Sequence, residues 1–128
     1  MSEISPDVEE IATSVVDAGI KVHSALGPGL LESVYEQCLA YELAQRGLSV
    51  RRQVPLPIVY GNFKIDTAYR IDMLVGEAVI IEVKAVEALT PVHHAQLLTY
   101  LKLSGLRLGF LMNFNVALLK QGLKRIAR

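Results

Sequence analysis

The sequence has 128 residues, of which 52% are hydrophobic and 20% charged, and it carries no net charge. This length suits one domain, which we expect to span residues 1–128, and the composition excludes an intrinsically disordered chain. The absence of net charge argues against indiscriminate coating of nucleic acid, and no apolar run approaches the ~20 residues of a membrane span.

The N-terminal stretch MSEISPDVEE is acidic and lacks the basic and apolar regions of a signal peptide. The single cysteine, Cys38, cannot form an internal disulfide, and a buried thiol in a reducing compartment is the simplest interpretation. We therefore expect a cytoplasmic protein that has no segment in a membrane.

Two helices are predicted in the N-terminal third of the chain. Ser5-Pro6, a capping residue followed by proline, predicts the start of the first helix, whose apolar residues recur at helical spacing as far as Leu26. The turn signal GPG follows. A second helix is predicted from about Leu30 to Arg46, where a glycine ends it.

The pattern then changes to the period of two that is typical of strands. From Val50 to Tyr60 the even-numbered residues are predicted to share one face, and two prolines on the other parity favour an edge strand. The turn signal YGN leads to a long second strand from Phe63 to Val75. Another turn leads to a third strand from Ala78 to Lys84.

Thr90-Pro91 repeats the combination of a capping residue and proline and opens a third helix, which runs to Ser104. The stretch LRLGFLMN, residues 106–113, predicts a last buried strand, and the tail from 118 to 128 is ambiguous between helix and strand. The order α-α-β-β-β-α-β, a hairpin meander followed by a helical crossover, predicts an α/β fold with a mixed sheet flanked by helices.

Glu82 and Lys84 interrupt a strand that is otherwise suited to the core. They lie two residues apart, so both side chains point to the same face, and their burial costs several kcal/mol per ion unless they are paired or bind a metal. Asp72 interrupts the preceding strand, and the hairpin brings it beside Glu82. Two neighbouring carboxylates repel, and such hard oxygen ligands favour Mg²⁺ or Mn²⁺ over zinc.

The loop of this hairpin decides whether Asp72 and Glu82 share a face. A two-residue loop at Gly76-Glu77 would turn the two carboxylates to opposite faces of the sheet. A three-residue loop pairs Val75 with Val79 and places the carboxylates side by side. The shared site therefore requires the longer loop, or a bulge that shifts the parity.

These residues resemble the signature of the PD-(D/E)XK nuclease superfamily, an aspartate on one strand and (Asp/Glu)-x-Lys on the next. Here they are Asp72 and Glu82-Val83-Lys84. The stretch GLLESVY, residues 29–35, resembles the Gly-x-x-Glu-x-x-Tyr motif of the GxxExxY protein family within that superfamily. The resemblance extends from about residue 8 to 126 and implies a restriction-endonuclease-like core. One departure is Ile71, where proline is usual.

The resemblance implies a Mg²⁺-dependent nuclease that hydrolyses phosphodiester bonds in DNA or RNA. Asp72 and Glu82 would bind Mg²⁺ or Mn²⁺, and Lys84 would orient the attacking water and stabilise the charge that develops on the phosphorane. Glu32 would add a carboxylate to the metal or to its water. Gln96 matches a glutamine that borders such sites.

Two further residues have alternative roles. Arg70, two residues before Asp72 on the same strand, would bind substrate phosphate or form a structural pair with a carboxylate. Tyr35 lies three residues after Glu32 on the same helical face. It is either a core residue or a residue whose hydroxyl orients that carboxylate.

Structural interpretations stay open for the charged residues. Glu82 and Lys84 would form a salt bridge at the end of the sheet, and Glu32 would simply favour the positive end of its helix. The alternative function is a nuclease-fold module for binding or dimerisation that performs no catalysis. An exposed edge strand on a small chain also makes a homodimer plausible.

Overall fold

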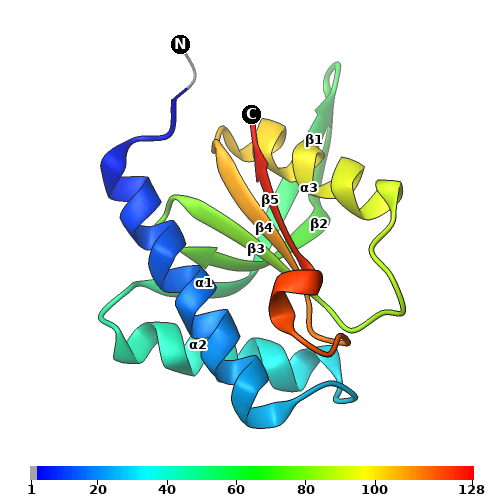
Figure 1. Cartoon of the computed structure of the whole chain (residues 1–128). Helices are drawn as coiled ribbons and strands as arrows, with labels where there is room; N and C mark the ends of the chain where they lie inside the picture. The colour runs from blue at the N-terminus through cyan, green and yellow to red at the C-terminus, as the bar shows by residue number, and fades with distance from the viewer. Residues whose placement is uncertain (1–2) are drawn as a thin grey trace.

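The computed structural model describes residues 3–128 (Figure 1). In chain order its elements are α1 (Pro6–Leu26), α2 (Glu32–Gln45), β1 (Val50–Tyr60), β2 (Phe63–Val75), β3 (Val79–Lys84), α3 (Pro91–Ser104), β4 (Leu108–Asn113), the 3₁₀ helix η1 (Leu119–Gln121) and β5 (Leu123–Ala127). In the described part of the chain, no helix is both long enough and apolar enough to span a membrane.

The five strands form one mixed sheet in the order β1-β2-β3-β4-β5. β3 and β4 are parallel and are joined by α3, whereas all other neighbours are antiparallel. The predicted α/β fold, with a hairpin meander and a helical crossover, is confirmed. The ambiguous tail forms η1 and β5, which pairs with β4 and adds a strand to the predicted order.

The helices begin where their caps satisfy free backbone N–H groups. The Ser5 hydroxyl accepts from Val8 N at 3.3 Å, and Thr90 and His93 form a reciprocal capping box. α2 begins two residues later than predicted, because Leu31 has an extended backbone. Glu32 is therefore the first residue of α2.

Helices cover both faces of the sheet, and each face has its own core (Figure 1). α1 and α2 pack on one face, where the core includes Tyr35, Met73 and Ile81. α3 packs on the other, where Ile80 and Leu97 are fully buried. Successive residues of β3 thus pack alternately into the two cores, which explains why this strand is apolar on both sides up to Glu82.

The β2–β3 hairpin has the longer of the two loops considered above. Val75 pairs with Val79 and Met73 with Ile81, which leaves three residues in the loop. Gly76 and Glu77 have positive φ values of 60° and 55° and make the reversal. The register on which a shared Asp72–Glu82 site depends is confirmed.

One prediction about β1 is wrong, because its even-numbered residues do not stay on one face. Val50 packs against the core of α1 and α2, whereas Val54 and Leu56 pack against the core of α3. The change occurs at Gln53, whose backbone is left-handed with φ 53°. On β2 the same change separates Met73 from Ile71.

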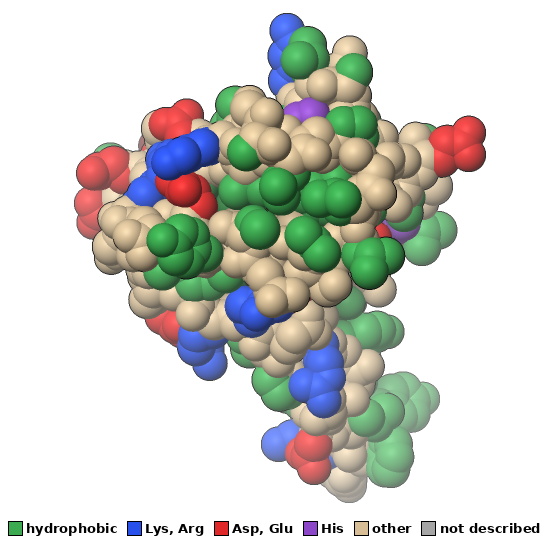
Figure 2. Space-filling view, turned by 90° about the horizontal axis from the view of Figure 1, so that it is seen from below, with side chains coloured by type: hydrophobic (Ala, Val, Ile, Leu, Met, Phe, Trp, Pro, Cys, Tyr) green, Lys and Arg blue, Asp and Glu red, His purple; other side chains and the backbone are tan. Residues whose placement is uncertain are grey.

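Two parts of the surface expose hydrophobic side chains. The outer part of the β1–β2 hairpin projects from the sheet (Figure 1) and exposes Tyr60 and Phe63, which are 82% and 64% accessible. Hydrophobic side chains also gather on the face that carries α1 and α2 (Figure 2). Cys38 lines a shallow groove there with Leu26 and Tyr41 and is half-buried rather than fully buried.

Candidate active site at the split between two strands

Asp72 and Glu82 lie where the ladder between β2 and β3 ends. The last backbone pair is Met73 with Ile81. Beyond it, Asp72 N donates to Glu82 Oε2 at 2.8 Å, and Val83 N donates to Asp72 Oδ2 at 2.9 Å. Each carboxylate thus accepts from the backbone of the opposite strand and lies in the opening between them.

The two carboxylates are in an environment that opposes their ionisation. Glu82 is 3% exposed, and burial, followed by the nearby charge of Asp72, raises its pKa to about 8. Burial also raises the pKa of Asp72, and the charge of Glu36 adds to this effect. Within residues 3–128, no lysine or arginine lies at ion-pair distance from either carboxylate.

The donor set fits a hard divalent cation. Two adjacent carboxylates form no ion pair with a described residue, and Glu82 Oε1 accepts no hydrogen bond from the described residues. No cluster of three or more His, Cys, Asp or Glu suited to a metal occurs in residues 3–128. Two carboxylates are enough protein ligands for a divalent cation such as Mg²⁺, which usually keeps water and phosphate oxygens as its other ligands.

Lys84 ends β3 close to this pair. Its positive charge lowers the pKa of both Asp72 and Glu82, although burial outweighs this effect in each case. Its amino group forms no ion pair with Glu82, so the salt bridge considered from the sequence is not formed. The lysine is half-buried near two carboxylates, and it forms an ion pair with neither of them.

Glu32 reaches the same end of β3 from the start of α2. Its Oε2 accepts from Ala85 N, the residue after Lys84, at 2.9 Å. The side chain is exposed and also occupies the first turn of its helix, where a carboxylate is favoured by the helix dipole. The structure therefore brings Glu32 to the edge of the site, without a direct contact to Asp72 or Glu82.

Glu36 and Gln53 are neighbours of the site that sequence reasoning missed. Glu36, one turn after Glu32, is 6% exposed and accepts from Arg52 Nε at 2.9 Å and from Gln53 Nε2 at 3.1 Å. Gln53 Nε2 also donates to Asp72 Oδ1 at 3.4 Å. The i+4 spacing from Glu32 on the buried side of the helix was the available signal for Glu36.

Gln96 lies on α3 and forms no hydrogen bond with Asp72 or Glu82. It lines a groove with Tyr69 and Tyr100. Burial raises the pKa of Tyr100 to about 12, and the charges of Glu82 and Asp72 contribute to this increase.

Arg70 and Tyr35 have different surroundings. Arg70 is exposed and forms no ion pair with a described residue, so its structural alternative is not formed. The Tyr35 hydroxyl donates to Gly27 O and accepts from Leu30 N, and its ring stacks on Phe114. It orders the loop before α2, and the suggested contact with Glu32 is not made.

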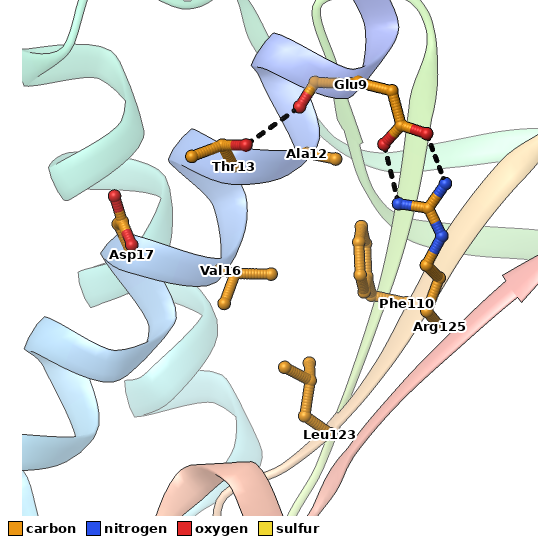
Figure 3. Close-up of a pocket in the computed structure, with 8 residues that line it drawn as sticks. All are labelled: Glu9, Ala12, Thr13, Val16, Asp17, Phe110, Leu123 and Arg125. Carbon is orange, nitrogen blue, oxygen red and sulfur yellow. Dashed lines mark hydrogen bonds and ion pairs between the residues drawn. The ribbon is translucent and has the colours of Figure 1, made fainter. Parts of the chain in front are cut away.

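A larger groove, about 420 Å³ in volume, lies away from these residues between α1 and the β4–β5 edge (Figure 3). Two of its charged groups are paired with each other, since Arg125 binds Glu9 through two hydrogen bonds of 2.7 Å. Ala12, Val16 and other apolar side chains form much of the remaining wall. Neither Asp72 nor Glu82 lines this groove.

Comparison with known proteins adds one match. A family model described as the PD-(D/E)XK nuclease superfamily matches residues 9–126. No curated protein and no solved structure matches the chain. The matched range includes every described element that contributes a residue to the site, from α2 to α3.

Proposed function

This chain belongs to the PD-(D/E)XK nuclease superfamily, and on that premise we propose that it is a metal-dependent nuclease that hydrolyses phosphodiester bonds of DNA or RNA. The observation that supports this proposal most strongly is the paired placement of Asp72 and Glu82 without a cationic partner. The stretch GLLESVY supports assignment to the GxxExxY family, and we propose one nuclease-like domain over residues 1–128.

In this proposal Asp72 and Glu82 hold Mg²⁺ or Mn²⁺. The ion, when bound, would polarise the phosphate and lower the pKa of a water molecule. Lys84 orients the attacking water and stabilises the negative charge that develops on the phosphorane. Glu32, held at Ala85 N by one oxygen, offers the other to the metal or to its water.

Substrate contacts are assigned to residues at the margin of the site. The exposed guanidinium of Arg70 binds a phosphate of the nucleic acid. Gln96, with the tyrosine-lined groove around it, contacts the substrate from α3. Tyr35 acts indirectly, because it orders the loop from Gly27 to Leu30 that leads into the helix of Glu32.

The test is a cleavage assay on single- and double-stranded DNA and RNA in Mg²⁺, Mn²⁺ or EDTA. We expect metal-dependent cleavage that Lys84→Ala reduces by about 100- to 1000-fold, the range seen when one group that stabilises the transition state is removed. Lys102→Ala, an exposed lysine on α3, is the matched control and should retain full activity. Equal activity in wild type and Lys84→Ala would refute the assigned role of Lys84.

The alternative is a nuclease-fold module for binding or dimerisation without turnover. Its supporting observation is the projecting hairpin, which exposes Tyr60 and Phe63. Unaltered nucleic-acid binding without cleavage in any metal would favour this module. A homodimer and a cytoplasmic location stay predictions, and light scattering tests the first against the chain mass of 14.1 kDa.

A further inference from the structure

Gln53 has a backbone conformation that a strand residue rarely adopts. Its φ is 53°, and among residues 3–128 only Glu77 is another non-glycine residue with positive φ. Glu77 lies in a hairpin loop, where the reversal requires such a value. Gln53 instead lies inside β1, between Arg52 and Val54, which both pair with β2. Strain of this kind persists only where the surroundings determine it strongly.

The side chain of Gln53 lies between two carboxylates, those of Glu36 and Asp72. It lies opposite Asp72, because Arg52 pairs with Met73 and Val54 with Ile71. Its side-chain nitrogen donates to Glu36 Oε1 at 3.1 Å and to Asp72 Oδ1 at 3.4 Å. The amide group has two N–H donors, so it can serve one acceptor on each side.

Glu36, which accepts a hydrogen bond from this amide, has a well-determined position. It is 6% exposed and forms an ion pair with Arg52 at 2.9 Å, so its position is determined by α2 and β1 together. A chain of contacts therefore runs from α2 through Glu36 and Gln53 to Asp72. On the other side, Val83 N holds the second oxygen of Asp72 at 2.9 Å. Both oxygens of Asp72 are thus tied to neighbouring elements.

We propose that Gln53 is a positioning residue that orients Asp72 for metal binding and that the left-handed backbone of Gln53 serves to place its amide between Glu36 and Asp72. This inference rests on the proposed function only in that Asp72 binds the metal. It adds an outer layer to the site, contributed by the edge strand and α2. Residues that orient metal ligands commonly affect affinity although they do not touch the metal.

The experiment is a calorimetric titration of Mn²⁺ into the metal-free full-length protein. Gln53→Gly removes the amide and accommodates the left-handed backbone without strain. We expect it to weaken Mn²⁺ binding by about 10- to 100-fold, the usual effect of losing a partner of a metal ligand. Glu77→Gly, at the other positive φ, is the matched control and should bind Mn²⁺ as the wild type does.

The outcomes separate the inference from the function on which it rests. If Gln53→Gly binds Mn²⁺ like the wild type, the inference is overturned, even if its thermal stability falls. If the wild type fails to bind Mn²⁺, or if Asp72→Asn binds Mn²⁺ as well as the wild type does, the proposed metal site at Asp72 and Glu82 is wrong. The inference about Gln53 then fails as well. Circular dichroism checks folding, and if Gln53→Gly does not fold, Gln53→Asn replaces it. Asparagine tolerates a left-handed backbone, but its amide is one methylene too short to reach both carboxylates.

Discussion

At the scale of residues, the site stores an unfavourable interaction that a bound cation would relieve. Asp72 and Glu82 each accept one backbone N–H from the opposite strand, but burial opposes both charged forms. The charge of Asp72 adds to this effect at Glu82, and the charge of Glu36 adds to it at Asp72. Hydrogen bonds that favour the charged forms are present and are outweighed. The metal-free site should therefore depend on pH, in a direction set by the raised pKa values.

The first residue-scale prediction concerns Glu82. Its pKa is about 8 in the folded protein against 4.5 as the ordinary value, so near neutral pH the native carboxyl keeps a proton that the unfolded chain has released. The stability from this group is complete below about pH 4.5 and is lost as the pH rises toward 8.

Glu82→Gln should remove this contribution to the pH dependence. In EDTA at pH 8, we expect the variant to exceed the wild type in free energy of unfolding by an amount on the order of a few kcal/mol. The advantage should shrink toward pH 5. Urea denaturation at several pH values measures both curves, and parallel curves would contradict the prediction.

At the scale of elements, the end of β3 is braced by β4 and by the turn after η1. The Asn113 side chain binds both the N–H and the carbonyl of Val86, just beyond Lys84 and Ala85. Asn113 N donates to Gly122 O at 2.9 Å. Two segments distant in sequence therefore hold the loop that also receives Glu32.

Gly122→Ala tests this brace. A Cβ at this position would lie 2.2 Å from the Asn113 carbonyl oxygen, and backbone atoms cannot yield as a flexible side chain can. We expect the free energy of unfolding to fall by about 1–3 kcal/mol, as for other overpacked sites. Chemical denaturation provides the measurement, with the exposed Lys120→Ala as control. Unchanged stability would mean that the contact relaxes without cost.

At the scale of the whole molecule, the site joins elements from both faces of the sheet. α2 contributes Glu32 and Glu36 from one face, and α3 contributes Gln96 and Tyr100 from the other. The strands between them supply Asp72 and Glu82, the pair proposed to bind the metal. A cation at Asp72 and Glu82 should consequently stabilise the entire folded chain, because the unfolded chain does not assemble this site.

Metal binding should therefore raise the midpoint of thermal unfolding. At about 100 times its dissociation constant, Mn²⁺ should add about 2.7 kcal/mol to the free energy of unfolding, and EDTA should reverse the effect. Asp72→Asn should show little or no increase. Differential scanning calorimetry makes the comparison, and equal increases in both proteins would place the ion elsewhere.

The sequence by itself determined the order of the elements as far as β4, the two capped helices that begin at Pro6 and Pro91, and the membership of Asp72, Glu82 and Lys84 in one region. These features depend on local signals, namely caps, turn residues and alternation, which act over a few residues. The long hairpin loop was one of two options that the sequence left open.

Only the tertiary structure decided how these residues meet. The face change at Gln53 breaks the alternation that predicted one face for β1, and the side chain of this residue contacts Glu36 and Asp72, which lie far away in the sequence. Likewise, the splitting of β2 from β3 depends on side chains that accept across strands. Such long-range contacts leave no periodic trace in the chain, which is why Gln53 emerged only from the fold, whereas the i+4 spacing from Glu32 was a signal for Glu36.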